Sequence, residues 1–152
     1  MWKMPTSIKV YEALGAVADG RLEISGNSGK CFSSSGNKYY EVTYEPESNA
    51  IMANDNASYW NGSLGYPAVA FLLQTEVLPY KSELGELLKN IKWKDINQKF
   101  KNDFDKTVEY ILSGFDEGTR WELEAYAEEL LSEIEKMKLV PLGKKKFPPK
   151  GY

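Results

Sequence analysis

The chain contains no histidine and only one cysteine, Cys31, among its 152 residues. Without histidine, the usual acid–base catalyst is excluded, together with the Ser–His and Cys–His nucleophile pairs and the common zinc ligand sets. A single cysteine forms no internal disulfide, which is typical of a cytoplasmic protein. Any chemistry therefore depends on carboxylates, lysines, tyrosines or backbone groups.

Long apolar runs are also missing. A membrane-spanning helix needs about 20 apolar residues, and neither such a run nor the apolar core of a signal peptide is visible. We therefore expect a cytoplasmic protein that does not associate with membranes. The content of hydrophobic residues (42%) and charged residues (27%) is typical of a globular protein. The net charge of −3 restricts any nucleic-acid contact to a local surface.

The longest apolar segment is Pro67 to Val77. Pro67 suits the first turn of a helix, because its fixed φ is helical and its missing N–H would have no partner there. The following residues are apolar on every side, so this helix must be surrounded by protein. The alternative is a buried strand, which Pro67 and the alanines favour less.

The remaining periodicity predicts an α+β fold. A helix is expected over 6–19, and short strands are expected over 21–24, 30–33, 38–44 and 50–53. Helical spacing then continues over 82–115, with a possible restart at Asn102, and over 119–137, where Thr119 and Glu122 resemble a capping box. We expect a mainly helical bundle around one buried central helix, with a small three- to four-stranded antiparallel sheet near the N-terminus. Residues 1–140 form one domain in this prediction, and 141–152 form a basic tail rich in proline and lysine.

A candidate ligand site surrounds Asp55, which stands between two asparagines just before an aromatic- and glycine-rich segment. With Tyr59, Trp60 and Tyr66, this acid is predicted to line the mouth of a pocket. The alternative is that Asp55 forms a turn or caps a short helix. The glycines of this segment are interpreted as turn or close-packing positions.

A candidate nucleic-acid site lies in the tail, where Lys144, Lys145, Lys146 and Lys150 alternate with Phe147 and Tyr152. Lysines bind phosphates and aromatic rings stack on bases. Two alternatives remain: the lysines fold back onto the acidic segment 116–135, or the tail is a disordered solubilising segment.

A candidate metal site consists of Asp103, Asp105 and Glu109. The last two are four residues apart, which places both carboxylates on one side of a helix, as a magnesium site requires. The same spacing is also typical of a solvated helix face.

The segment Leu64-Gly65-Tyr66-Pro67-Ala68-Val69 resembles the signature helix of ribonuclease III-like domains, in which Leu-Gly-Asp-Ala-Val opens a buried helix. Tyr66 stands where that family carries its metal-binding aspartate, and Gly62 stands where it carries an upstream glutamate. The resemblance implies a helix enclosed by others and an association with RNA. It argues against phosphodiester cleavage, which needs two metal-holding carboxylates.

The sequence therefore predicts a non-catalytic intracellular binding module for a protein partner or RNA, without a cofactor. The alternative is a magnesium-dependent enzyme that uses Asp55 with Asp103, Asp105 or Glu109. A third hypothesis is a homodimer that forms through the tyrosine-bearing face of the strand at 38–44.

Overall fold

The computed structural model describes residues 1–150, so the last two residues of the predicted tail, including Tyr152, lie outside the described part. The α+β class is confirmed. In chain order the elements are α1 (Ser7–Ala18), β1 (Leu22–Ser25), β2 (Ser28–Phe32), β3 (Tyr39–Glu45), β4 (Ala50–Ala53), the π-helical turn η1 (Ala57–Asn61), α2 (Tyr66–Gln74), α3 (Ser82–Gly85), the 3₁₀ turn η2 (Glu86–Leu88), α4 (Trp93–Lys99), α5 (Phe104–Leu112), α6 (Glu117–Met137) and β5 (Val140–Pro141).

The sheet has five strands in the order β1-β2-β3-β4-β5. The first four form the expected antiparallel meander, but β5 pairs parallel to β4, so the prediction of a purely antiparallel sheet of three or four strands is wrong. Strand β5 has only two residues, which are too few to show the alternation of apolar and polar side chains that predicts a strand, and one of them is a proline without an N–H. The pairing is instead long-range: Val140 N–H donates to Asn49 O at 3.1 Å.

Helix α2 lies at the centre of the core, as predicted. Residues 67–73 are all buried, and Gly65 precedes the helix at the N-cap. The helix ends earlier than expected, at Gln74, because Glu76 adopts the left-handed conformation (φ 63°) and Val77 N–H donates back to Leu72 O. Val77 is 41% exposed, so its predicted enclosure is wrong.

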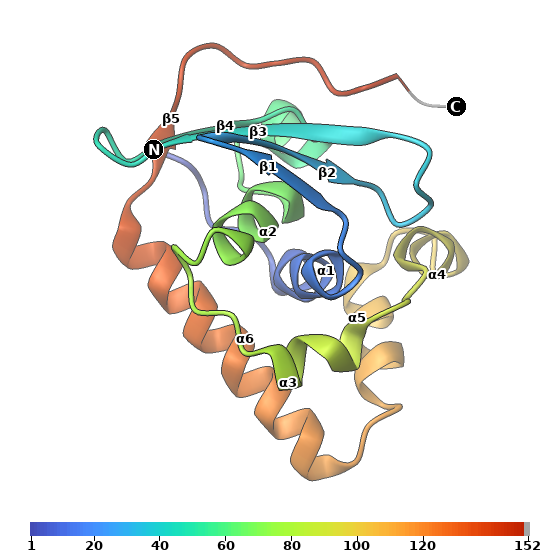
Figure 1. Cartoon of the computed structure of the whole chain (residues 1–152). Helices are drawn as coiled ribbons and strands as arrows, with labels where there is room; N and C mark the ends of the chain where they lie inside the picture. The colour runs from blue at the N-terminus through green and yellow to red at the C-terminus, as the bar shows by residue number, and fades with distance from the viewer. Residues whose placement is uncertain (151–152) are drawn as a thin grey trace.

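The layers are visible in Figure 1, where α2 lies against one face of the sheet and α1 packs against α2 on the same side. The C-terminal segment, drawn in red, crosses above the other face of the sheet. Tyr40, Val42 and Tyr44 of β3 point into the core and are at most 8% exposed. The chain's own helices cover this face of β3. It is therefore not available as the subunit interface of the homodimer hypothesis.

The helical spacing predicted over 82–115, with one possible restart at Asn102, is confirmed only in part, because the helix is also broken elsewhere. Helical residues occur there in short pieces, because Asn90, Lys101 and Asn102 adopt left-handed backbone angles that end a helix. The restart near Asn102 is confirmed: α5 begins at Phe104, and the carboxylate of Asp103 accepts a hydrogen bond from Lys106 N–H.

Helix α6 carries the acidic segment and packs on the core through its predicted stripe. Five residues of this stripe are buried: Leu123, Tyr126, Ala127, Leu130 and Ile134. Its cap is Asp116, whose carboxylate accepts a hydrogen bond from Thr119 N–H at 2.8 Å. The capping box predicted for Thr119 and Glu122 is wrong, because the N-cap lies three residues before Thr119. Within residues 1–150, no helix is long and apolar enough to cross a membrane.

Candidate functional site

The turn η1 is held in place by Asp55. Its carboxylate accepts a hydrogen bond from Ser58 Oγ at 2.5 Å and a longer one from Ser58 N–H at 3.4 Å, and the residue is only 5% exposed. Burial raises the pKa of this carboxyl, while the hydrogen bonds from Ser58 lower it. Asp55 therefore caps the start of the η1 turn, as the capping interpretation predicts.

Gly65 explains how α2 approaches this carboxylate so closely. A Cβ at this position would lie 1.9 Å from Asp55 Oδ2 and 2.8 Å from its Cγ. Only glycine leaves room there. The close-packing interpretation of this glycine is therefore confirmed, and it fixes η1 against the N-terminus of α2.

An exposed aromatic group forms where η1 meets the C-terminal segment. The ring of Tyr59 lies 4.7 Å from that of Trp60 and 4.9 Å from that of Phe147, and Lys145 Nζ lies 5.5 Å from the centre of the Tyr59 ring. Trp60 is 69% exposed and Phe147 is 75% exposed. Two groups that the sequence singled out separately are thus brought together. We call Tyr59, Trp60, Phe147 and Lys145, together with Lys144, Lys146 and Lys150 that flank them in the chain, the aromatic–lysine surface; of the four lysines, Lys145 is the one that, among the described residues, has a contact to a ring of this set.

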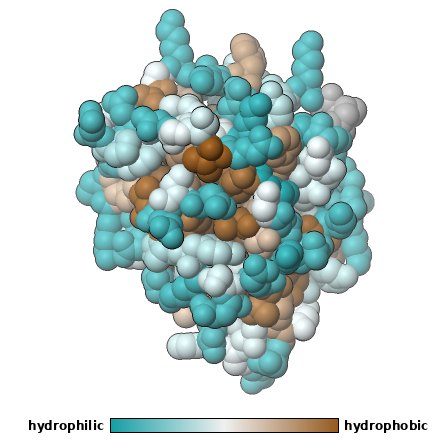
Figure 2. Space-filling model, in the orientation of Figure 1, coloured by the Kyte–Doolittle hydropathy of each residue, from teal (hydrophilic) through white to brown (hydrophobic). Residues whose placement is uncertain are grey.

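Within residues 1–150, Lys144, Lys145, Lys146 and Lys150 form no ion pair. The alternative in which they fold back onto the acidic segment 116–135 is therefore wrong. Along the upper edge of Figure 2, where Figure 1 places the C-terminal segment, long hydrophilic side chains project from the body of the molecule.

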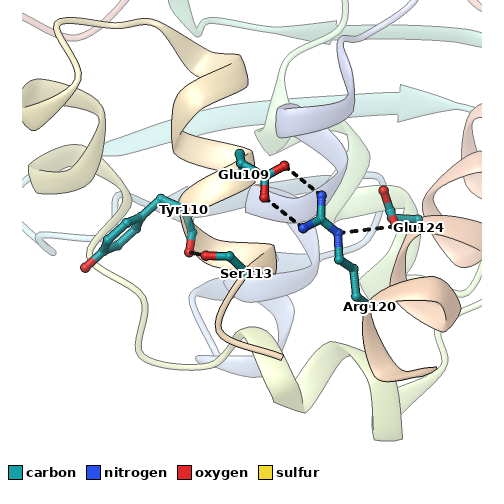
Figure 3. A network of polar contacts seen from close by, with 5 residues as sticks. All are labelled: Glu109, Tyr110, Ser113, Arg120 and Glu124. Carbon is teal, nitrogen blue, oxygen red and sulfur yellow. Dashed lines mark hydrogen bonds and ion pairs between the residues drawn. The ribbon is translucent and has the colours of Figure 1, made fainter. Parts of the chain in front are cut away.

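The three acids of the predicted metal site have other roles. Asp103 caps α5, and Asp105 is exposed. Glu109 receives two hydrogen bonds of 2.8 Å from the guanidinium of Arg120, which also contacts Glu124 (Figure 3). This contact lowers the pKa of Glu109. Among the residues that the structure describes, no three carboxylate or thiol groups are placed to hold a metal ion. The magnesium-dependent alternative gains no support from these positions.

Tyr66 points to a different place from Tyr59 and Trp60. It lines a cavity of about 530 Å³, which we call the α1–α4 cavity. The walls of this cavity come from α1, the β2–β3 loop with the start of β3, the segment from η1 to α2, and the region of α4 up to the start of α5. Of the four residues in the predicted ligand site, only Tyr66 lines it; Asp55 lies beneath η1.

Glu12 is the cavity residue that sequence reasoning missed. It is only 7% exposed, although it is ionisable. The signal was present in the sequence, because Glu12 follows Ile8 by four residues and therefore lies on the inner face of a helix whose other inner residues are apolar. An acid in such a position is unusual and indicates a specific polar environment.

A protein-family model matches residues 2–140; its description is "Uncharacterised conserved protein UCP014422". The chain belongs to this family. No curated protein and no solved structure matches the chain. The part that matches the UCP014422 model contains the whole lining of the α1–α4 cavity, whereas the four tail lysines lie after it. The resemblance to ribonuclease III-like domains is not tested by these comparisons and stays a prediction.

Proposed function

We propose that this protein is a non-catalytic binding module for single-stranded RNA, and that the strand binds at the aromatic–lysine surface. The observation that carries the proposal is the contact of Tyr59 with Phe147 and Lys145, which places exposed rings beside lysines that have no acidic partner in the described chain. Unpaired bases stack on exposed aromatic rings, and lysines neutralise the adjacent phosphates.

The magnitudes agree with a modest but measurable affinity. Each base that stacks on an aromatic side chain contributes about 1–3 kcal/mol. Four lysines that contact phosphates give a slope of about −3 in a plot of log K against log salt concentration, since a single strand contributes about −0.7 per contact. A duplex offers no unstacked bases, so we expect the surface to prefer single strands.

A protein partner is the other occupant that the sequence left open. Exposed aromatic residues also occur at protein interfaces. The four clustered lysines favour RNA, because charged residues are depleted at the centre of protein interfaces, whereas phosphate contacts supply most of the affinity for nucleic acids. The salt dependence of binding separates the two.

The test uses a fluorescent single-stranded RNA of about ten nucleotides and measures anisotropy over a range of salt concentrations. Trp60→Ala should weaken binding about tenfold, the effect of one lost stacking contact of about 1.4 kcal/mol. Trp121→Ala is the matched control, because Trp121 is 70% exposed but lies on the acidic helix α6. Lys145→Ala should lower the salt slope by about 0.7. Equal affinities of the two tryptophan variants, or no binding at low salt, would refute the proposal.

A further inference from the structure

The α1–α4 cavity is lined by two residues, Glu12 and Asn97, that each carry a buried oxygen without a hydrogen-bond partner in residues 1–150. We propose that it binds a phosphorylated, hydroxyl-bearing ring compound, the chemistry that nucleoside monophosphates and pentose phosphates share. This inference does not depend on RNA binding at the aromatic–lysine surface, because the two sites use different residues.

Glu12 is the first observation. It lines the cavity, is 93% buried, and its Oε1 has no hydrogen-bond partner within residues 1–150. Its nearest cation is Lys9, whose Nζ lies 3.7 Å from Oε1. Burial raises the pKa of this carboxyl, and Lys9 and Arg21 lower it. A buried carboxylate is costly unless donors satisfy its oxygens, so a ligand hydroxyl or N–H group is the expected partner.

Asn97 provides a second acceptor of the same kind. Its Oδ1 is buried and has no hydrogen-bond partner in the described part of the chain, and the residue lines the same cavity from α4. Glu12 and Asn97 therefore contribute two acceptors from two different helices. A ligand with several donor groups, such as the hydroxyls of a sugar ring, matches this arrangement.

The charge of the lining indicates an anionic group on the ligand. Lys9, Lys38 and Lys94 contribute three positive charges and Glu12 contributes one negative charge, which gives +2 (3 − 1) for the lining. The whole chain carries −3. A phosphate is an anion that lysines commonly bind, so these side chains favour a phosphorylated ligand over a neutral one.

The rest of the lining suits a polar ring. Eight further amide and hydroxyl side chains line the wall: Asn56, Asn61, Gln98, Asn102, Thr6, Ser33, Ser34 and Ser63. Aromatic side chains complete it, including Tyr40 and Tyr66, whose rings pack edge to face with centres 6.0 Å apart. A volume of about 530 Å³ lies within the range of small-molecule sites.

The experiment measures binding by isothermal titration calorimetry, with adenosine, guanosine, cytidine and uridine monophosphates, ribose 5-phosphate and inorganic phosphate as the probes. We expect at least one ring phosphate to bind with a Kd below about 1 mM and to bind at least tenfold more tightly than inorganic phosphate. Tighter binding of a nucleotide than of ribose 5-phosphate assigns the site to nucleotides, whereas equal or weaker binding assigns it to pentose phosphates. No saturable binding of any ring phosphate, or equal binding of inorganic phosphate, would overturn the proposal.

Variants show whether binding occurs in this cavity. Glu12→Gln and Lys94→Ala should each weaken the ring phosphate at least fivefold, while Lys136→Ala on α6 should have no effect. Because Glu12 is buried, circular dichroism must confirm that the Glu12→Gln variant is folded. Lys94 is only partly buried, so if Glu12→Gln does not fold, the Lys94→Ala variant decides whether the ligand binds in this cavity. Trp60→Ala should leave this affinity unchanged even if it abolishes RNA binding, which separates the two proposals. Unchanged affinity in the Lys94 variant would contradict the assignment.

Discussion

Replacement of Gly65 with alanine tests the packing that holds η1 against α2. The added methyl group would lie 1.9 Å from Asp55 Oδ2, far inside a normal contact distance. Asp55 has little room to move, because it is buried and its carboxylate is fixed by Ser58. Overpacking of this kind costs about 1–3 kcal/mol. We expect a loss near the upper end, about 2–3 kcal/mol, because the contact is with a polar atom that is itself hydrogen-bonded.

The cause of this loss is tested by a second substitution. Asp55→Ala alone removes the hydrogen bonds to Ser58 and should cost about 1–2 kcal/mol. It also removes the atoms that the new methyl group would meet. The double variant should therefore be less destabilised than the sum of the single variants, with a coupling of at least about 1 kcal/mol.

Urea denaturation followed by circular dichroism measures these free energies of unfolding. Gly118→Ala is the matched control: its methyl group would meet nothing nearer than Asp116 Oδ1 at 3.5 Å, and alanine favours a helix. This variant should be as stable as the wild-type protein or up to about 1 kcal/mol more stable. Additive effects of Gly65→Ala and Asp55→Ala, within about 0.5 kcal/mol, would refute the reasoning.

Three further predictions follow from burial and charge. The pKa of Glu12 is raised in the folded state, so the folded protein loses stability as the pH rises from about 4.5 through that pKa and the buried carboxyl ionises. Glu12→Gln does not ionise, so its free energy of unfolding should increase relative to that of the wild-type protein over this range. A difference between the two proteins that is constant with pH would contradict this. Leu72→Ala, at a fully buried position, should lose about 2–5 kcal/mol on urea denaturation, whereas Val77→Ala, at a 41% exposed position, should lose less than about 1 kcal/mol. Arg120→Gln breaks the contacts with Glu109 and Glu124, so thermal unfolding should shift downward at low salt and recover toward the wild-type value at about 1 M NaCl; a shift that does not depend on salt would indicate lost packing instead.

The elements that the sequence predicted correctly are those whose stability is decided locally or by a clear apolar period. Alternation in 39–45 separates the buried Tyr40, Val42 and Tyr44 from the residues on the opposite face, and the period of α6 places Leu123 and Leu130 in the core. Where a single residue adopts a left-handed angle, as at Asn90, the period alone gave no sign of a break, because the apolar spacing is nearly preserved across it.

The two candidate sites were found only in part, because both depend on contacts between distant segments. Tyr59 and Lys145 were each predicted as binding residues, but no pattern connects positions 86 residues apart (145 − 59) in the chain. The α1–α4 cavity takes its lining from residues 6 to 104, and only Tyr66 among them was predicted. The one local indication of this cavity was Glu12, an acid on the buried inner face of α1.

The turn η1 links the two proposed sites, since its residues divide between them. Ala57 and Asn61 line the α1–α4 cavity, as does Asn56 at the N-cap of the turn, while Tyr59 and Trp60 belong to the aromatic–lysine surface. A π-helical turn is rare and is often found at functional sites. Its position depends on Asp55, because this carboxylate accepts a hydrogen bond from Ser58 of η1 and lies against Gly65 at the N-terminus of α2. A substitution at Gly65 should therefore weaken both binding activities together, whereas Trp60→Ala affects only one. This difference separates damage to the shared support from damage to a single surface.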